Sequence, residues 1–194
     1  MFYCMPQPHF TDGNLIILFG VNTESETSVT VPNYVEERIR VCVDLYGIVT
    51  TSKPDRSNTL VLVIVDTITS SAIKKMLING GIREDLILFA DSPKSVEQSF
   101  DYVLNFIKKR ANPPYMYFVG SDWHKDSYDS AVLSKMKGYQ IRFEGAPDYR
   151  PVDSVSKDKE RNAPTKGMGY YKDKLKNKAV DMVINYIFPD DKNK

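Results

Sequence analysis

The chain has 194 residues, a formal net charge of +1 and two cysteines. This length predicts a single domain, residues 1–194, whose core is large enough to need neither a disulfide nor a metal. The small net charge excludes a chain-wide attraction to nucleic acid or anionic lipid, so no nucleic acid partner is expected. Because the start resembles no signal peptide and no apolar run approaches about 20 residues, we expect a cytoplasmic protein without a membrane span.

The first unit of the chain is a predicted strand followed by a helix. Residues 15–19 form an apolar run that is too short for a helix and lacks alternation, which is typical of a strand buried on both faces. A helix is expected to begin at Asn33, a good N-cap with Glu36 three residues later. Gly47 is its predicted stop.

Two further units follow the same pattern. Apolar runs at 60–65 and 86–89 predict the second and third strands. The helix after the second strand is expected to be capped by Ser70 or Ser71 and to end at the Asn-Gly-Gly of residues 79–81. After the third strand, Ser92 as N-cap, with a proline next to it, predicts another helix start.

The last part of the chain begins with a predicted fourth strand at 115–119 and a helix at about 127–137. Alternating residues at 139–143 predict a fifth strand with one solvated face, hence an edge strand. Residues 145–168 are expected to be irregular, and a final helix is expected from about 168 to 188.

Together these elements predict the fold class. Four strand-then-helix units and a fifth strand indicate a Rossmann-like, doubly wound, mainly parallel five-stranded sheet in a three-layer α/β/α arrangement. Its core spans about residues 14–150, and residues 151–194 add the irregular segment and the C-terminal helix. In such sheets ligands bind where strands end and helices begin.

The loop after the fourth strand carries the most reactive group of side chains. Ser121, Asp122 and His124 place a hydroxyl, a carboxylate and an imidazole within four residues. Two interpretations of His124 stay open: a general acid or base, and a surface or capping histidine. Asp122 either orients that histidine, binds hydroxyls of a ligand, or caps a helix.

Other loop residues are candidates for ligand binding. Asn22 and Asp66 follow the first two strands. Ser92 and Ser95 stand at a helix start, where backbone N–H groups can bind phosphate. Arg38 is either solvated or reaches into the cleft.

Several motif tests fail. Ser121 stands in Val-Gly-Ser-Asp-Trp, which is not the Gly-x-Ser-x-Gly of a nucleophile elbow. The Gly-Val-Asn-Thr at residues 20–23 is not a dinucleotide-binding Gly-x-Gly-x-x-Gly, and no Walker loop is present. Asp122, His124 and Asp126 match no zinc spacing, so no metal is predicted.

The ordered motifs resemble those of a known family. They are Arg38 with Leu45-Tyr46, Ala72 with Met76-Leu77 and Gly81-Ile82, the stretch at 92–98, Val-Gly-Ser-Asp-Trp-His at 119–124, and Gly-Ala-Pro at 145–147. In this order they resemble the SanA/ElyC/YdcF-like family, the domain of unknown function two-one-eight. The resemblance implies a Rossmann-like domain with a polar cleft and no settled reaction. It also implies S-adenosylmethionine as a possible cofactor, since one branch is said to bind it, while other branches are linked to cell-envelope polymers.

The resemblance assigns residues and also shows departures. The family's Ser-x-x-Thr-x-Glu-Asn falls on Ser92, Ser95, Glu97 and Gln98, and its Thr-Ser-Asp-x-His falls on Gly120, Ser121, Asp122 and His124. Family Gly-Gly pairs are replaced by Gly20-Val21 and Asp66-Thr67, an acidic residue by Phe89, and an arginine by Ser127.

Two functional hypotheses result. The first is a transferase or hydrolase that binds a nucleotide-type or phosphorylated small ligand at the strand ends. In it, His124 is the acid or base, and Asp122 and Glu97 orient His124 or the ligand. The alternative is a non-catalytic binding or interaction module that has lost part of the family site and uses either the same cleft or the basic stretch at 157–178.

Overall fold

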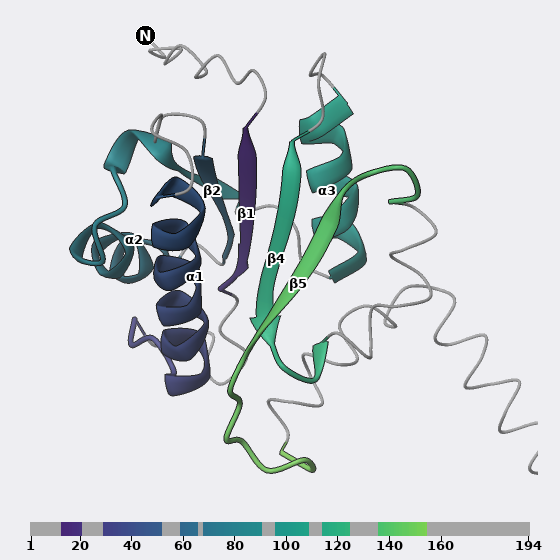
Figure 1. The fold of residues 1–194 in the computed structure, drawn as a ribbon. Helices are drawn as coiled ribbons and strands as arrows, with labels where there is room; N and C mark the ends of the chain where they lie inside the picture. Colours follow the sequence, from purple (N-terminus) through teal and green to yellow (C-terminus); the bar gives the residue numbers. More distant parts are fainter. Residues whose placement is uncertain are drawn as a thin grey trace, which may run out of the picture.

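The structure is a computed structural model that describes residues 13–20, 29–51, 59–65, 68–90, 96–108, 114–124 and 136–154. Within these ranges the strands are β1 (Asn14–Phe19), β2 (Thr59–Ile64), β3 (Ile87–Ala90), β4 (Tyr115–Ser121) and β5 (Ile141–Ala146). They form one parallel sheet in the order β3-β2-β1-β4-β5 (Figure 1). The predicted Rossmann-like class is therefore confirmed, and every strand pair in this sheet is parallel.

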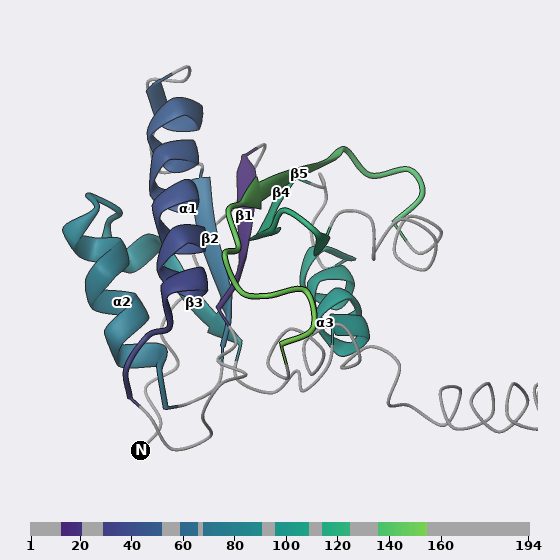
Figure 2. The same cartoon turned by 90° about the horizontal axis from the view of Figure 1, so that it is seen from below.

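Helices cover both faces of the sheet. They are α1 (Asn33–Thr51), α2 (Ser70–Asn79) and α3 (Val96–Lys108). Figures 1 and 2 show α1 and α2 on one face and α3 on the other, which gives the predicted three layers. The central strands β1 and β2 are buried along their whole length, as expected for strands packed on both faces.

The helix ends differ from the predictions at two places. Helix α1 does not stop at Gly47 but continues to Thr51, because Val49 is buried and one helical glycine costs only about 1 kcal/mol. At α2 the cap position is occupied by Thr69, not by Ser70 or Ser71, and the Thr69 side chain makes no capping hydrogen bond.

Other boundaries agree closely with the sequence. Gly81 ends α2 with a φ of 90°, a value that favours glycine. A short 3-10 helix, η2 (Glu84–Leu86), takes up the first residue of the third predicted strand, so β3 starts at Ile87. Strand β5 lies at the edge of the sheet, as predicted. It spans Ile141–Ala146, not 139–143, because its pairing with β4 continues through two residues of the segment predicted to be irregular. The helices expected at 127–137 and 168–188 fall outside the described residues, apart from a turn at 136–138.

The strand order places a topological switch point between β1 and β4. The chain proceeds from β1 to β2 and β3 on one side, then crosses back to β4 and β5 on the other. In open α/β sheets the crevice beyond the carboxyl ends of such neighbouring strands is the usual ligand site. Here those ends carry Phe19 and Gly20 on β1, and Gly120 and Ser121 on β4. Among the described helices, none is long and apolar enough to cross a membrane.

Candidate functional site

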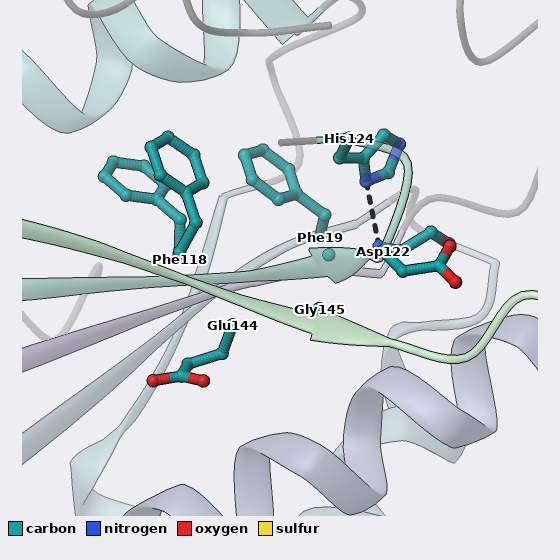
Figure 3. Close-up of a pocket in the computed structure, with 9 residues that line it drawn as sticks. Phe19, Phe118, Asp122, His124, Glu144 and Gly145 are labelled. Atoms are coloured by element: carbon teal, nitrogen blue, oxygen red, sulfur yellow. Dashed lines mark hydrogen bonds between the residues drawn. The ribbon is translucent and has the colours of Figure 1, made fainter. Parts of the chain in front are cut away.

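A tight turn at the end of β4 folds the chain back on itself. The N–H of Asp122 donates to the carbonyl of Ala146 over 2.9 Å and so continues the pairing of β4 with β5. The N–H of Trp123 donates to Oδ1 of Asp122 over 2.8 Å. One residue later, His124 returns over the strand end, and its Nδ1 accepts the N–H of Ser121 over 2.9 Å (Figure 3).

This last hydrogen bond determines the chemical form of His124. A backbone N–H only donates, so Nδ1 must be unprotonated and the imidazole carries its proton on Nε2. The residue is only 3% exposed, and its ring centroid lies 6.1 Å from that of Phe19 and 4.0 Å from that of Trp123. His124 is thus a buried, neutral imidazole held in one orientation, not a surface histidine.

Two glycines make room for the turn. A Cβ on Gly120 would lie 2.5 Å from Nδ1 of His124, closer than real side chains approach one another. A Cβ on Gly145 of the neighbouring strand would lie 2.9 Å from the Cα of Asp122. The imidazole and the turn therefore pack directly on glycine backbone, and a larger residue at either position would displace them.

A cavity of about 110 Å³ opens beside the imidazole. Figure 3 shows Phe19, Phe118 and His124 on the same side of the sheet and Glu144 on the other. Phe118 also stacks on Phe143 at 5.3 Å between ring centroids. The lining residues are Phe19, Phe118, Gly120, Ser121, Asp122, His124, Phe143, Glu144 and Gly145. The cavity therefore lies over the carboxyl end of β4, next to the switch point, with walls from β1 and β5 as well. It combines aromatic rings with the neutral imidazole and the residues Asp122 and Glu144.

The hydroxyl of Ser121 faces the opposite side of the sheet, toward α1. There Arg38, which is 0% exposed, donates to Ser121 Oγ from Nε over 3.1 Å and from Nη2 over 2.7 Å. Its Nη1 donates to the carbonyl of Phe19 over 3.1 Å. Arg38 is thus a buried link between the carboxyl ends of β1 and β4, which rules out the solvated alternative.

Asp148, which the sequence interpretation did not single out, completes this cluster. Its Oδ2 accepts the hydroxyl of Ser121 over 2.7 Å and Nε1 of Trp123 over 2.8 Å. Its Oδ1 accepts the N–H of Arg150 over 3.2 Å and Nε of Arg150 over 2.9 Å, and Nη2 of Arg38 lies 4.0 Å from Oδ2. The Arg150 guanidinium also lies 3.5 Å from the ring centroid of Tyr34.

The charge state of Asp148 follows from these neighbours. Burial opposes ionisation, but hydrogen bonds from Arg150, Trp123 and Ser121 outweigh it and lower the pKa of the Asp148 carboxyl far below its usual range. The sequence did contain a signal for this residue. Asp148 follows the fifth strand as the other candidates follow theirs, but the predicted irregular segment at 145–168 includes it.

The predicted site residues therefore separate into groups. Ser121, Asp122, His124 and Arg38 meet at the carboxyl end of β4, although Ser121 contacts His124 through its backbone and Arg38 through its hydroxyl. The Asp122 carboxylate is exposed and caps the next N–H, instead of orienting the imidazole. Asn22, Asp66, Ser92 and Ser95 lie outside the described residues, and so does the side chain of Glu97 in α3.

The fold and the site define a Rossmann-like α/β protein with a small aromatic cavity at the switch point of its sheet. Within the described residues, no group of three or more His, Cys, Asp and Glu side chains could hold a metal ion. Comparison with models of known protein families, with curated proteins and with solved structures finds no match to this chain.

Proposed function

We propose that this protein binds a nucleotide-type or phosphorylated small ligand at the switch point between β1 and β4. The observation that carries the proposal is the cavity beside His124, which lies where ligands bind in other open α/β sheets. The cavity also places the buried imidazole of His124 beside phenyl rings, and one polar group among apolar walls is usual in ligand sites.

The size and walls of the cavity favour a particular part of such a ligand. A volume of about 110 Å³ is well below the roughly 300–1,000 Å³ of a site for a whole drug-sized molecule. It is nearer to the roughly 150 Å³ of a cavity that takes benzene. The walls are the rings of Phe19, Phe118 and Phe143, which suit a flat uncharged group better than a phosphate. In this proposal a base-like ring enters the cavity, and any phosphate stays outside it.

The state of His124 favours a specific role for the imidazole. To act as a base at Nε2, the ring would have to move its proton to Nδ1 and lose the hydrogen bond from Ser121. A neutral ring with its proton on Nε2 is instead suited to donate a hydrogen bond to a ligand oxygen or nitrogen. His124 is therefore proposed as a donor and, if turnover occurs, as an electrophile that polarises the bound group.

Two observations favour binding without turnover as the second form of this proposal. The Ser121 hydroxyl accepts two hydrogen bonds from Arg38 and donates one to Asp148, which uses its full hydrogen-bonding capacity. Asp122 caps the N–H of Trp123. Two of the proposed chemical groups thus have structural roles, as expected for a binding module. Incubating a bound compound with the protein and analysing it by mass spectrometry separates turnover from binding alone.

The remaining sequence expectations belong to the same proposal. Membership of the SanA/ElyC/YdcF-like family stays a proposal that rests on the ordered motifs of the sequence alone. A cytoplasmic location is supported by Cys42, a free and fully buried thiol that fits a reducing compartment. S-adenosylmethionine stays among the candidate ligands on the strength of the resemblance alone.

A thermal-shift screen tests the proposal. The compounds are adenosine mono- and diphosphate, S-adenosylmethionine and glucose 6-phosphate, and the expected result is stabilisation by a compound that contains a base. His124→Asn keeps an acceptor for the Ser121 N–H but removes the Nε2 donor, so the stabilisation should disappear. Asp153→Asn, an exposed change, should leave it intact. A hit of equal size in His124→Asn would contradict the proposed site.

A further inference from the structure

We propose that Asp148 is a positioning residue that holds His124 in its neutral, Nε2-protonated form. The inference rests on the proposed function, because it assigns Asp148 to the same site. It concerns the turn at 121–124, which Asp148 contacts through Ser121 and Trp123.

One carboxylate oxygen connects the two ends of this turn. Oδ2 of Asp148 accepts the Ser121 hydroxyl at the start of the turn and the Trp123 indole N–H just before His124. The two distances, 2.7 and 2.8 Å, are those of strong hydrogen bonds to a charged acceptor. Since the Asp148 side chain is 0% exposed, water does not compete for these bonds. Asp148 therefore fixes the spacing between Ser121 and Trp123.

Ser121 transmits this constraint through the sheet. Its hydroxyl is held on the α1 side by Asp148 and Arg38, while its N–H reaches His124. A change in the orientation of Ser121 would move the N–H away from Nδ1. The imidazole would then lose the hydrogen bond that selects its tautomer, and we expect a mixture of the two tautomers. This is the way outer residues orient the histidines of metal sites.

The chemistry of the cluster requires an ionised carboxylate at position 148. The groups that bond to Asp148 from Ser121, Trp123 and Arg150 are all donors. A carboxylate only accepts, whereas asparagine has the same shape and, in either orientation of its amide, turns an NH₂ group toward some of these donors. Asp148→Asn is therefore a nearly isosteric change that breaks the constraint, and Asp153→Asn, on the same segment but exposed, is its matched control.

The test is ¹⁵N NMR of the His124 ring in the ligand-free protein. The chain contains two histidines, so His9→Asn is used as the background in all samples and leaves one imidazole to observe. His124 should show a single Nε2-protonated tautomer both in this background and in its Asp153→Asn variant. Asp148→Asn should show a mixture of the two tautomers and bind the stabilising nucleotide about tenfold more weakly. A single Nε2-protonated tautomer in folded Asp148→Asn would overturn the inference.

A second variant keeps the test decisive if Asp148→Asn does not fold. Trp123→Phe removes one of the three hydrogen bonds to Oδ2 and keeps an aromatic ring. It should show a smaller but measurable share of the second tautomer, and a spectrum identical to wild type would overturn the inference. The tautomers are read without ligand, so a tautomer change in a protein that binds none of the compounds would refute the proposed function and leave the positioning by Asp148 intact.

Discussion

The backbone N–H of Ser121 donates to Nδ1 of His124 over 2.9 Å, while the hydroxyl of Ser121 donates to Asp148 on the other side of the sheet. One serine thus joins the cavity to a buried charge cluster. The sequence places Ser121, Asp122 and His124 next to one another and suggests that their side chains converge. In the structure the strand alternation separates the hydroxyl from the imidazole, and only the backbone connects them.

We expect Gly120→Ala to disrupt the packing of His124 on β4. In Gly120→Ala the new Cβ would lie 2.5 Å from Nδ1 of His124, so the ring must move and lose its bond to Ser121. We expect a loss of about 1–3 kcal/mol in the free energy of unfolding, measured with urea, together with loss of ligand binding. The control is Gly47→Ala in α1, where a Cβ meets nothing within 4 Å. It should stabilise the protein by up to about 1 kcal/mol.

Arg38 should matter far more than its neighbour Arg40 on the same helix. Arg38→Lys keeps the charge but cannot reach both Ser121 and Phe19 with a planar fork, so a buried charged group loses its partners. We expect about 3 kcal/mol of destabilisation in chemical denaturation. Arg40 is exposed and bonds to Glu37, so Arg40→Lys should change stability little. Equal effects of the two substitutions would show that the Arg38 link has no structural importance.

The contribution of Asp148 to stability should depend on pH in one direction. Its pKa is lowered in the folded protein, so its stabilising effect is complete above the ordinary carboxyl pKa of about 4 and is lost as the pH falls below that value. At pH 7, Asp148→Asn should cost about 3 kcal/mol, because the arginine charges lose their buried partner. Urea unfolding of both proteins at pH 7 and pH 3 should show this difference shrinking at pH 3. A difference that grows at pH 3 would contradict the assignment of Asp148 as an ionised partner.

Cys42 should be unreactive in the native protein. It is fully buried in α1, and burial raises the pKa of its thiol to about 12, so almost no thiolate exists at neutral pH. In a Cys4→Ser background, a chromogenic disulfide reagent should titrate no thiol natively and one thiol in urea. Rapid native labelling would show that α1 opens from the sheet.

The fold was predictable because its signals are local. The almost wholly apolar β1 and β2, and the polar loops between the units, dictate a parallel sheet with helices on both faces. The end of α1 was not predictable from Gly47, since tertiary burial of Val49 outweighs the cost of one helical glycine.

The site was only partly predictable for a related reason. Position relative to strand ends identified the turn with Ser121 and His124, but it could not show which face of the sheet each group would meet. The link between Arg38 and Asp148 joins positions far apart in the chain, and their pairing depends on the register of β4 with β5. No local pattern encodes such a contact.

The most direct test of the central claim is the ¹⁵N spectrum of the His124 ring before and after addition of the nucleotide that stabilises the protein most. In the predicted result, Nδ1 stays unprotonated because Ser121 still donates to it, and the Nε2 resonance shifts as the ligand approaches. A nucleotide that binds, as judged by its thermal shift, while both His124 resonances stay unchanged would place the ligand elsewhere and contradict the claim.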